Sequence, residues 1–385
     1  MKRVLKVVSL ALGLSLSGSW VRVWTPCVWA APPAKPVKPA KPVKTPSPNE
    51  LLLKGMQSGQ SVLVREALLK GADPNFHFQG KFVLHWAVEF KQTDLIELLL
   101  KLKVDLDAPG LDRFTPLMRM AQQKNLSSPE HLALIRRLID AGMDPLHSPG
   151  GTSPHYLAAW FGNTPLLALL LEKGADPQFV TNEESVLMMA AHGGHLDAVE
   201  ILLKAGAQLA FHSRDGESAL TYAIKGQNLE IVRFLLKQGA PVKSQDTGGF
   251  SPLFAALESL QPEFVRLLLE AGAEAEVRDS DQETPLLWAA RTGFVAGATL
   301  LLEKGANANS QDREGNSPLL LGVKAGNERV ATQLTRLLLD FKANPNLANK
   351  AGETPLGFVL EYDYPEVAQM LEVAGATPPP REPIE

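Results

Sequence analysis

The stretch that decides the fold is TPLLWAARTGFVAGATLLLEKGA, residues 284–306. Thr284 is a residue type that caps helices, because its hydroxyl can accept a hydrogen bond from an otherwise unpaired backbone amide. Pro285 follows at the first helical position, where a missing N–H costs nothing. The small apolar residues after it predict a short helix, and the leucines at 300–302 predict a second helix after a turn. Gly305 is then suited to a left-handed helix end.

This pattern recurs along most of the chain, and 33 residues separate Ser218, Ser251, Thr284 and Ser317 from one another. The first residues of the units are Phe82, Thr115, Ser153, Ser185, Ser218, Ser251, Thr284, Ser317 and Thr354. One helix pair has too little apolar surface to fold alone, whereas stacked copies bury one another's faces. The sequence therefore predicts an array of helix pairs rather than two or three separate domains.

A second recurring signal is Gly-Ala after the leucine run of each unit. Its glycines are Gly71, Gly142, Gly174, Gly206, Gly239, Gly272, Gly305 and Gly375, and Lys103-Val104 and Lys342-Ala343 fill the two gaps. Residues 51–76 supply one more unit that lacks the Thr-Pro-Leu start. Two units are longer than the rest, and we expect insertions near 122–130 and 326–331 to bulge from the edge opposite the turns that link the units.

Pattern and period resemble the ankyrin repeat over about residues 51–376, in about ten repeats. The segments closest to the family's pattern are Asp215-Gly216-Glu217-Ser218-Ala219-Leu220, Gly352-Glu353-Thr354-Pro355-Leu356 and Leu171-Glu172-Lys173-Gly174-Ala175-Asp176-Pro177. The resemblance implies an all-α solenoid of helix–turn–helix pairs with β-turn or hairpin fingers. Its units usually carry a histidine in fourth place that bridges the backbone between turns. Only His85 keeps it, so we expect that hydrogen-bond ladder to be mostly absent and stacking to depend more on apolar packing.

The N-terminal segment 1–30 reads as a secretory signal peptide. Lys2 and Arg3 open it, residues 7–21 are apolar or small, and a cleavage site fits between Ala30 and Ala31. Arg22 lies after the apolar run, where three tryptophans also crowd, so an uncleaved membrane anchor stays open as the alternative. The only cysteine, Cys27, lies inside this leader, and a chain cleaved there has no thiol for disulfides, catalysis or metal binding.

Residues 31–50 form a linker rich in proline and lysine, and 377–385 are expected to be a disordered tail. A proline at nearly every third position favours an extended polyproline conformation. Such a segment suits either a stalk that crosses a periplasm or a solubilising linker.

Charge is unevenly distributed. The whole chain has a formal net charge of −4; the leader carries +4 and the linker +3, so the remainder carries −11. This balance argues against nucleic acid as a ligand and favours a protein partner with a basic surface. No phosphate-binding loop or nucleophile elbow is present. His192 and His195 have no third ligand nearby, and Gly194-His195 fits the turn between helices, so we expect no metal, no cofactor and no catalysis.

The candidate binding surface is a column of residues, one from each unit, four positions after the unit's first residue. In the resembled fold this position points to the concave side. The candidate partner-binding residues, from this column and the next exposed inner positions, are Trp86, Phe90, Arg119, Trp160, Met189, Tyr222, Trp288, Arg291 and Phe358. This composition is typical of an interface core, although the same side chains could merely seal adjacent helices. We expect Trp86, Tyr222 and Trp288 to be exposed. We also expect a second contact surface at the tips of the turns that link the units, residues 76–81, 214–217, 278–283 and 311–316.

Taken together, these features predict a non-enzymatic protein-interaction scaffold, monomeric and exported to a bacterial periplasm or cell surface. Two alternatives stay open: a secreted effector that binds host proteins, and an adaptor held in the membrane by its uncleaved leader. Membrane contact is expected only in the second case.

Overall fold

The computed structural model describes residues 45–110 and 112–378. The predicted leader 1–30, the Ala30/Ala31 cleavage site, most of the linker and most of the tail lie outside these residues. Residues from Pro46 onward group into one compact unit.

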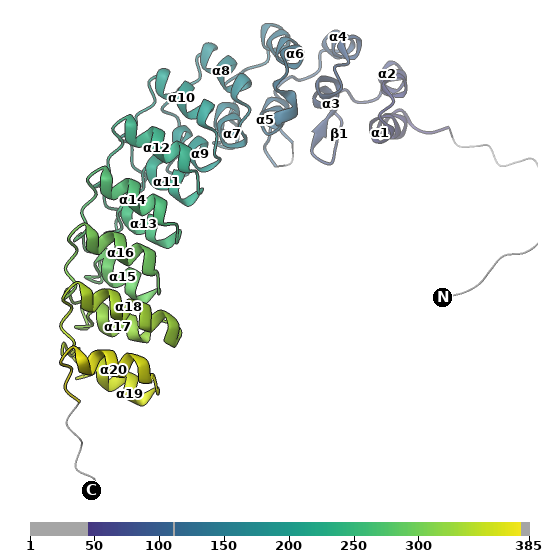
Figure 1. Cartoon of the computed structure of the whole chain (residues 1–385). Coiled ribbons are helices and arrows are strands. Elements are labelled where there is room, and N and C mark those ends of the chain that lie inside the picture. Colours follow the sequence, from purple (N-terminus) through teal and green to yellow (C-terminus); the bar gives the residue numbers. More distant parts are fainter. Residues whose placement is uncertain (1–44, 111, 379–385) are drawn as a thin grey trace, which may run out of the picture. The chain divides into compact units, whose positions relative to one another are not determined.

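The unit is built from helices that alternate between two rows, in ten successive pairs. In Figure 1 the odd-numbered helices from α1 to α11 lie on the concave side and the even-numbered helices from α2 to α12 on the convex side. The inner row is α1 (Pro48–Ser58), α3 (Val83–Glu89), α5 (Pro116–Ala121), α7 (Pro154–Phe161), α9 (Val186–His192), α11 (Ala219–Lys225), α13 (Pro252–Glu258), α15 (Pro285–Arg291), α17 (Pro318–Lys324) and α19 (Pro355–Glu361). The outer row is α2 (Ser61–Leu69), α4 (Thr93–Lys101), α6 (Pro129–Asp140), α8 (Thr164–Glu172), α10 (Leu196–Lys204), α12 (Leu229–Lys237), α14 (Pro262–Glu270), α16 (Val295–Glu303), α18 (Glu328–Asp340) and α20 (Pro365–Val373). The predicted all-α solenoid is confirmed.

The expected caps begin and end these helices. The Thr284 hydroxyl accepts from the Leu287 amide at 3.3 Å, with Pro285 at the first helical position. Gly305 has φ +89°, and Lys342, which replaces glycine in another unit, adopts φ +64°. The repeated sequence signals therefore mark the helix ends, although the caps at Phe82 and Ser251 form no side-chain hydrogen bond.

The first helix begins earlier than the sequence analysis expected. Helix α1 starts at Pro48, inside the stretch assigned to the linker. Ser47 accepts a hydrogen bond from the Glu50 amide at 3.3 Å, and the Glu50 carboxylate accepts one from the Ser47 amide at 2.7 Å. This reciprocal capping box supplies the Ser-Pro start that the first unit seemed to lack.

Short fingers connect the pairs. Two of them are antiparallel hairpins, β1 (His77–Phe78) with β2 (Lys81–Phe82) and β3 (Val180–Thr181) with β4 (Glu184–Ser185). Other fingers are turns held by one acidic side chain; Asp279, for example, accepts from the Asp281 and Glu283 amides, each at 2.9 Å. Hydrogen bonds between fingers, such as Ser280 N–H to the Gly248 carbonyl at 2.8 Å, join adjacent units.

The two long units place their extra residues in helices. In one, the 3₁₀-helix η1 (Lys124–Ser127) precedes α6, which has 12 residues; in the other, α18 has 13. Other outer helices have nine residues, as α16 does. The extra residues therefore build one added turn and two longer outer helices.

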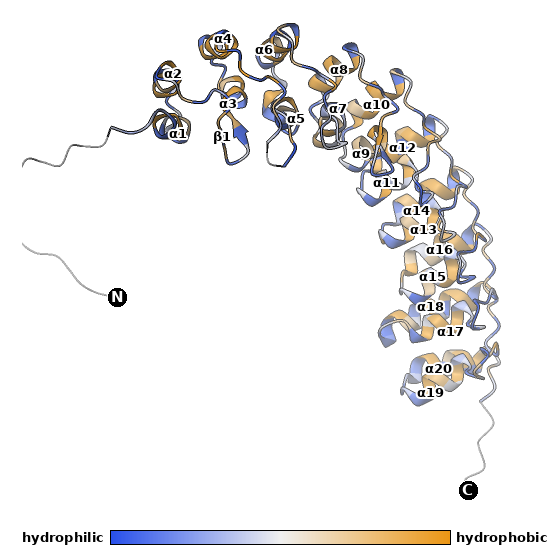
Figure 2. Cartoon of the chain, turned by 180° about the vertical axis from the view of Figure 1, so that it is seen from behind, coloured by the Kyte–Doolittle hydropathy of each residue, from blue (hydrophilic) through white to orange (hydrophobic). Residues whose placement is uncertain are grey.

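One large hydrophobic core runs through the stack from Leu52 to Leu371, and a small second cluster consists of Leu287, Ala290 and Leu321. Phe254 and Phe264 are its largest fully buried side chains. Figure 2 shows hydrophobic stretches on the helices and hydrophilic residues toward the fingers and helix ends. Each pair is thus held by burial of apolar surface against its neighbours.

Polar links also join the units, in addition to the apolar packing on which stacking was expected to depend more. His85 does not provide them: both of its ring nitrogens lack a hydrogen bond of normal geometry within the described residues, although Gln123 lies beside it. Instead, the Asn75 side chain accepts from the Asp105 amide at 3.0 Å, and Asn309 accepts from Asn344 at 2.7 Å. Asn346 accepts from the Thr377 amide at 2.8 Å in the same way. Asp107 and Glu276 accept from the Asp144 and Asn307 amides in the same way, so asparagines (the asparagine ladder) and carboxylates share these links.

Candidate functional site

The candidate column lies along the inner helices, but most of it is buried. Trp86 is 4% exposed and Trp288 is 8% exposed, so the expectation that these two side chains are exposed is wrong. Met189 is buried as well, and Tyr222 and Phe358 are half-buried. Residues at this position pack against adjacent inner helices, and longer side chains from the helix ends cover them.

Two of the candidate aromatic side chains are exposed and lie at the ends of inner helices. Phe90 is 49% exposed and Trp160 is 40% exposed. Phe90 packs against Trp86 with ring centroids 4.9 Å apart. Both residues line a hollow of about 380 Å³ between α1 and α3, together with Met56, Gln57, Phe78, Gln79 and Lys81. The structure brings these two candidates together, and it likewise brings Arg291 onto Trp288 in another unit.

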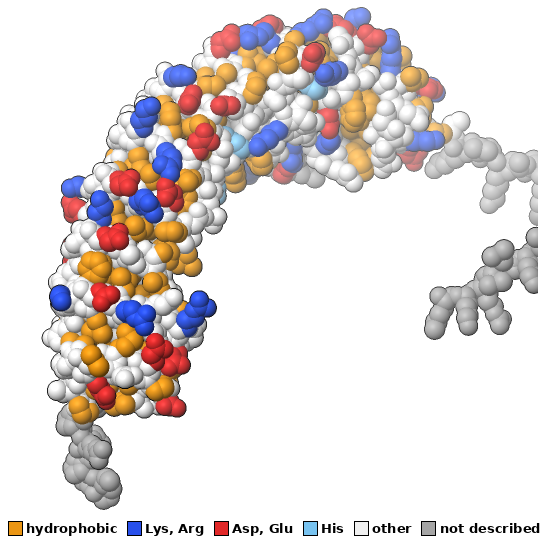
Figure 3. All heavy atoms as spheres, in the orientation of Figure 1, with side chains coloured by type: hydrophobic (Ala, Val, Ile, Leu, Met, Phe, Trp, Pro, Cys, Tyr) orange, Lys and Arg blue, Asp and Glu red, His pale blue; other side chains and the backbone are white. Residues whose placement is uncertain are grey.

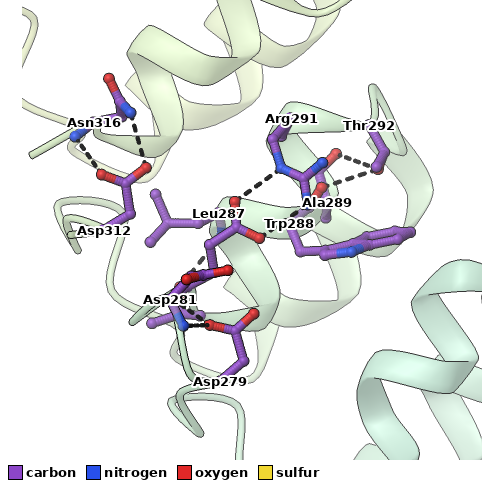
Figure 4. Close-up of polar contacts among 11 residues, drawn as sticks. Asp279, Asp281, Leu287, Trp288, Ala289, Arg291, Thr292, Asp312 and Asn316 are labelled. Carbon is purple, nitrogen blue, oxygen red and sulfur yellow. Dashed lines mark hydrogen bonds and ion pairs between the residues drawn. The ribbon is translucent and has the colours of Figure 1, made fainter. Parts of the chain in front are cut away.

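Each of the two candidate arginines forms an ion pair with a carboxylate of this chain. Arg291 donates to both Glu283 oxygens at 2.8 and 2.9 Å, and it lies over the Trp288 ring, 6.0 Å from the centroid (Figure 4). Its hydrogen bond to Glu283 raises the pKa of Arg291. Arg119 pairs with Asp112 and lies 4.8 Å from the centroid of the Phe114 ring, and burial lowers the pKa of Arg119.

A cluster that the sequence analysis missed joins three adjacent units. The Glu184 carboxylate accepts hydrogen bonds from Tyr156 Oη at 3.0 Å and from Tyr222 Oη at 2.7 Å. Burial, followed by this hydrogen bond, raises the pKa of each tyrosine, so both remain protonated donors. Tyr156 also contacts Trp160 edge to face, and His192 contacts Tyr222 in the same way. Of these residues, only Tyr222 and Trp160 are among the candidate partner-binding residues predicted from the sequence.

The histidine pair does not form a metal site. His195 Nε2 donates to the Trp160 carbonyl at 3.0 Å, so this side chain links two units from the turn between helices. Within 45–110 and 112–378, no three His, Cys, Asp or Glu side chains gather closely enough to hold a metal ion. In the same part of the chain, no helix has the length and apolar character needed to span a membrane.

Charges of both signs are interspersed over the face drawn in Figure 3, with hydrophobic patches between them. The predicted tip surface includes the Asp279 and Asp312 turns (Figure 4). Asp312 binds the Asn316 amide and side chain at 2.7 and 2.9 Å, so much of its hydrogen-bonding capacity serves the turn itself.

Comparisons with known proteins agree with this architecture. The family model described as "Ankyrin repeats (3 copies)" matches residues 155–246, 187–279 and 239–312, and the one described as "Ankyrin repeat" matches residues 79–111. No curated protein matches the sequence. The count of about ten repeats of this family stays a prediction.

Similar solved structures include the human ASB11 ankyrin repeat domain, with a TM-score of 0.50 and 27% identity, covering 59% of this chain and 100% of that one. An ankyrin repeat domain from Acinetobacter baumannii AYE has a TM-score of 0.47 and 31% identity, covering 50% of this chain and 98% of that one. The ankyrin repeat domain of Bcl-3, a member of the IkappaB protein family, has a TM-score of 0.49 and 25% identity, and the match covers 59% of this chain and 99% of that one. With its helix pairs, capped turns and matching family models, the chain belongs to the ankyrin repeat family.

Proposed function

We propose that this protein is an exported, non-enzymatic scaffold that binds a protein partner on the concave side of its repeats. Ankyrin repeats are protein–protein interaction modules, and this chain has such repeats over much of its length. The observation that supports the concave side most directly is the exposure of Phe90 and Trp160, 49% and 40%, at the ends of inner helices. Aromatic side chains on a rigid array can bind with little loss of conformational freedom.

The concave surface is tested with a double variant, Phe90→Ala with Trp160→Ala, in the full chain. Full-length protein is used to capture its partner from the native compartment, and the captured protein is then identified and purified. We expect the double variant to weaken binding of the purified partner about tenfold or more, since interface aromatics commonly contribute about 2 kcal/mol or more each.

The matched control removes two exposed apolar side chains from the convex side. Val62 and Leu69 in α2 are 75% and 66% exposed, and Val62→Ser with Leu69→Ser should leave binding unchanged. Equal binding by the wild type and the Phe90/Trp160 variant would refute the concave assignment. Trp86 and Trp288 are unsuitable for this test, because truncating buried tryptophans destabilises the fold itself.

Export is proposed from the sequence of the leader, with the periplasm or cell surface as the destination. N-terminal sequencing of the protein recovered from cells should give a start at Ala31. A retained leader in the membrane fraction would favour the anchored adaptor, and recovery from culture medium or host cells would favour the secreted effector.

A further inference from the structure

In three units an ion pair joins the finger to the end of the inner helix, and a fourth pair joins two adjacent units. Within a unit, the pair links the residue just before the unit's first residue to the residue seven after that first residue. Glu217 pairs with Lys225, and Glu283 pairs with Arg291 at 2.8 Å. In the unit of Phe82 the charges are reversed, with Lys81 2.7 Å from Glu89. Glu353 is 2.7 Å from Lys324, which belongs to the preceding unit.

These pairs neutralise carboxylates that are largely shielded from water. The side chains of Glu283, Glu89 and Glu217 are only 14%, 15% and 19% exposed. A shielded carboxylate is stabilised by a nearby cation much more than a fully hydrated one. Two of the cations also lie over an aromatic ring of the concave side, Arg291 over Trp288 and Lys324 over Phe358, at 6.0 and 5.4 Å from the ring centroids.

The unit that begins at Ser185 breaks this rule. It keeps the finger glutamate, Glu184, but its helix ends in His192, and none of the ion pairs within the described residues includes Glu184. Two neutral tyrosine hydroxyls bind the carboxylate instead, one to each oxygen. Each oxygen keeps a second lone pair, so the charge is held in place without being neutralised.

Each tyrosine that binds this carboxylate packs against a further aromatic side chain. The preceding unit has Trp160 at its helix-end position, 40% exposed and packed on Tyr156 with centroids 6.3 Å apart. His192, also exposed, contacts Tyr222 with centroids 6.1 Å apart. Three other units carry lysine or arginine at this helix-end position, whereas these two neighbouring units carry aromatic rings there.

We propose that Glu184, with Tyr156, Trp160 and Tyr222, binds an arginine side chain of the protein partner. The partner's guanidinium takes the place that Arg291 takes opposite Glu283. Arginine fits better than lysine because its planar guanidinium can bind carboxylate oxygens and stack on an aromatic ring at once. This inference rests on the proposed function, since it names the partner chemistry that the concave side selects.

The first test measures binding of the full chain to acetyl-GGRGGRGG-amide by calorimetry. The same peptide with citrulline in place of arginine is the neutral, isosteric comparison. We expect Glu184→Gln to weaken binding of the arginine peptide about 10- to 100-fold, as for loss of a charge-assisted hydrogen bond. The citrulline peptide should bind the wild type as weakly as the arginine peptide binds this variant.

Two further variants control for structure and local charge. Glu283→Gln makes the same change at a finger glutamate that already has its own arginine, and binding should change by less than about threefold. His192→Arg supplies an internal cation eight residues from Glu184, the separation of Glu283 and Arg291, so it should compete with the peptide and weaken binding about tenfold or more. Circular dichroism and thermal melting confirm that each variant is folded.

Three results would overturn the proposal: equal binding by wild type and Glu184→Gln, equal binding of the arginine and citrulline peptides, or no binding to the wild type at millimolar peptide. The tyrosine–carboxylate contacts would then serve only to join the three units. Failure here is distinguishable from failure of the scaffold function. If the purified partner loses affinity for the Phe90/Trp160 variant but binds Glu184→Gln and His192→Arg normally, the scaffold function stands and the arginine site is refuted.

Discussion

Acidification should loosen two particular units of the array, because His85 and His155 are buried in them as neutral side chains. Burial lowers the pKa of each histidine from 6.5 to about 4. His155 Nε2 donates to the Asp176 carbonyl at 3.1 Å, and its Nδ1 has no hydrogen-bond partner in the described part of the chain. A proton added to Nδ1 in the folded state would therefore create a buried, poorly solvated charge.

The sign and size of the effect follow from linkage. At a pH between 4 and 6.5 the unfolded chain binds the proton and the folded chain does not, so stability is present above pH 6.5 and decreases as the pH falls toward 4. Each pH unit in this interval costs about 1.4 kcal/mol per histidine. Lowering the pH from 6.5 to 5 therefore removes about 2 kcal/mol at each of the two sites.

Hydrogen exchange resolved by peptide measures this effect unit by unit. After correction for intrinsic exchange, the free energy of opening in α3 and α7 should decrease by about 2 kcal/mol between pH 7 and pH 5. Helix α15 is the internal control, because its unit contains no histidine. His85→Leu and His155→Gln remove the titrating groups, and each variant should lose the pH dependence in its own unit alone.

Equal loss of protection in α15, α3 and α7 would refute the reasoning, because acidification would then act through the array as a whole. Persistence of the pH dependence in the unit of His85 after His85→Leu would equally contradict the assignment to that ring.

Three further predictions concern the turns and links between units. Asp279→Ala removes an acceptor of two backbone hydrogen bonds on a residue that is 6% exposed, and we expect a loss of about 2–3 kcal/mol in urea denaturation; no change in the midpoint would contradict this role. Asn309→Ala breaks one link of the asparagine ladder and should cost about 1 kcal/mol, whereas Lys304→Ala, on the exposed side of the same unit, should cost less than about 0.5 kcal/mol. Gly216→Ala should destabilise more than Gly305→Ala. Both glycines have positive φ, but a Cβ at 216 would lie 2.5 Å from Asp246 Cα while one at 305 meets nothing within 4 Å; equal melting temperatures would disprove that contact.

The fold was predictable because the signals that define it are local and repeated. Thr284, Pro285 and Gly305 each set a backbone conformation through their own chemistry, and the same types recur in unit after unit. The start of α1 was missed because Ser47-Pro48 stands at the end of a proline-rich run, where one more proline gives no distinct signal. The asparagine ladder was missed for another reason. Asn75 and Asn309 are visible in the sequence, but their side-chain oxygens meet the backbone amides they bind only once adjacent turns are stacked.

Part of the candidate surface was predictable as well. The sequence identified the inner helices, and it placed Phe90 and Trp160 among the candidate residues. It did not identify Glu184, because a glutamate in a finger resembles the other finger glutamates until its hydrogen bonds to Tyr156 and Tyr222 are seen. The signal that could have found it is the exception to the pattern, a finger glutamate whose helix ends in His192 rather than lysine or arginine.

The burial of Trp86 and Trp288 shows why the two inner positions have different roles. Four residues after its start, a unit is in the middle of a short helix, so a large side chain there packs between adjacent helices and closes the stack. Seven residues after its start, the helix is ending, and the side chain can extend over the column residue, as Arg291 does over Trp288. Changes at the first position therefore alter stability, whereas changes at the second alter the exposed surface of the inner helices. Trp160 and His192 occupy the second position in two consecutive units, so the proposed arginine site can vary there without disturbing the core.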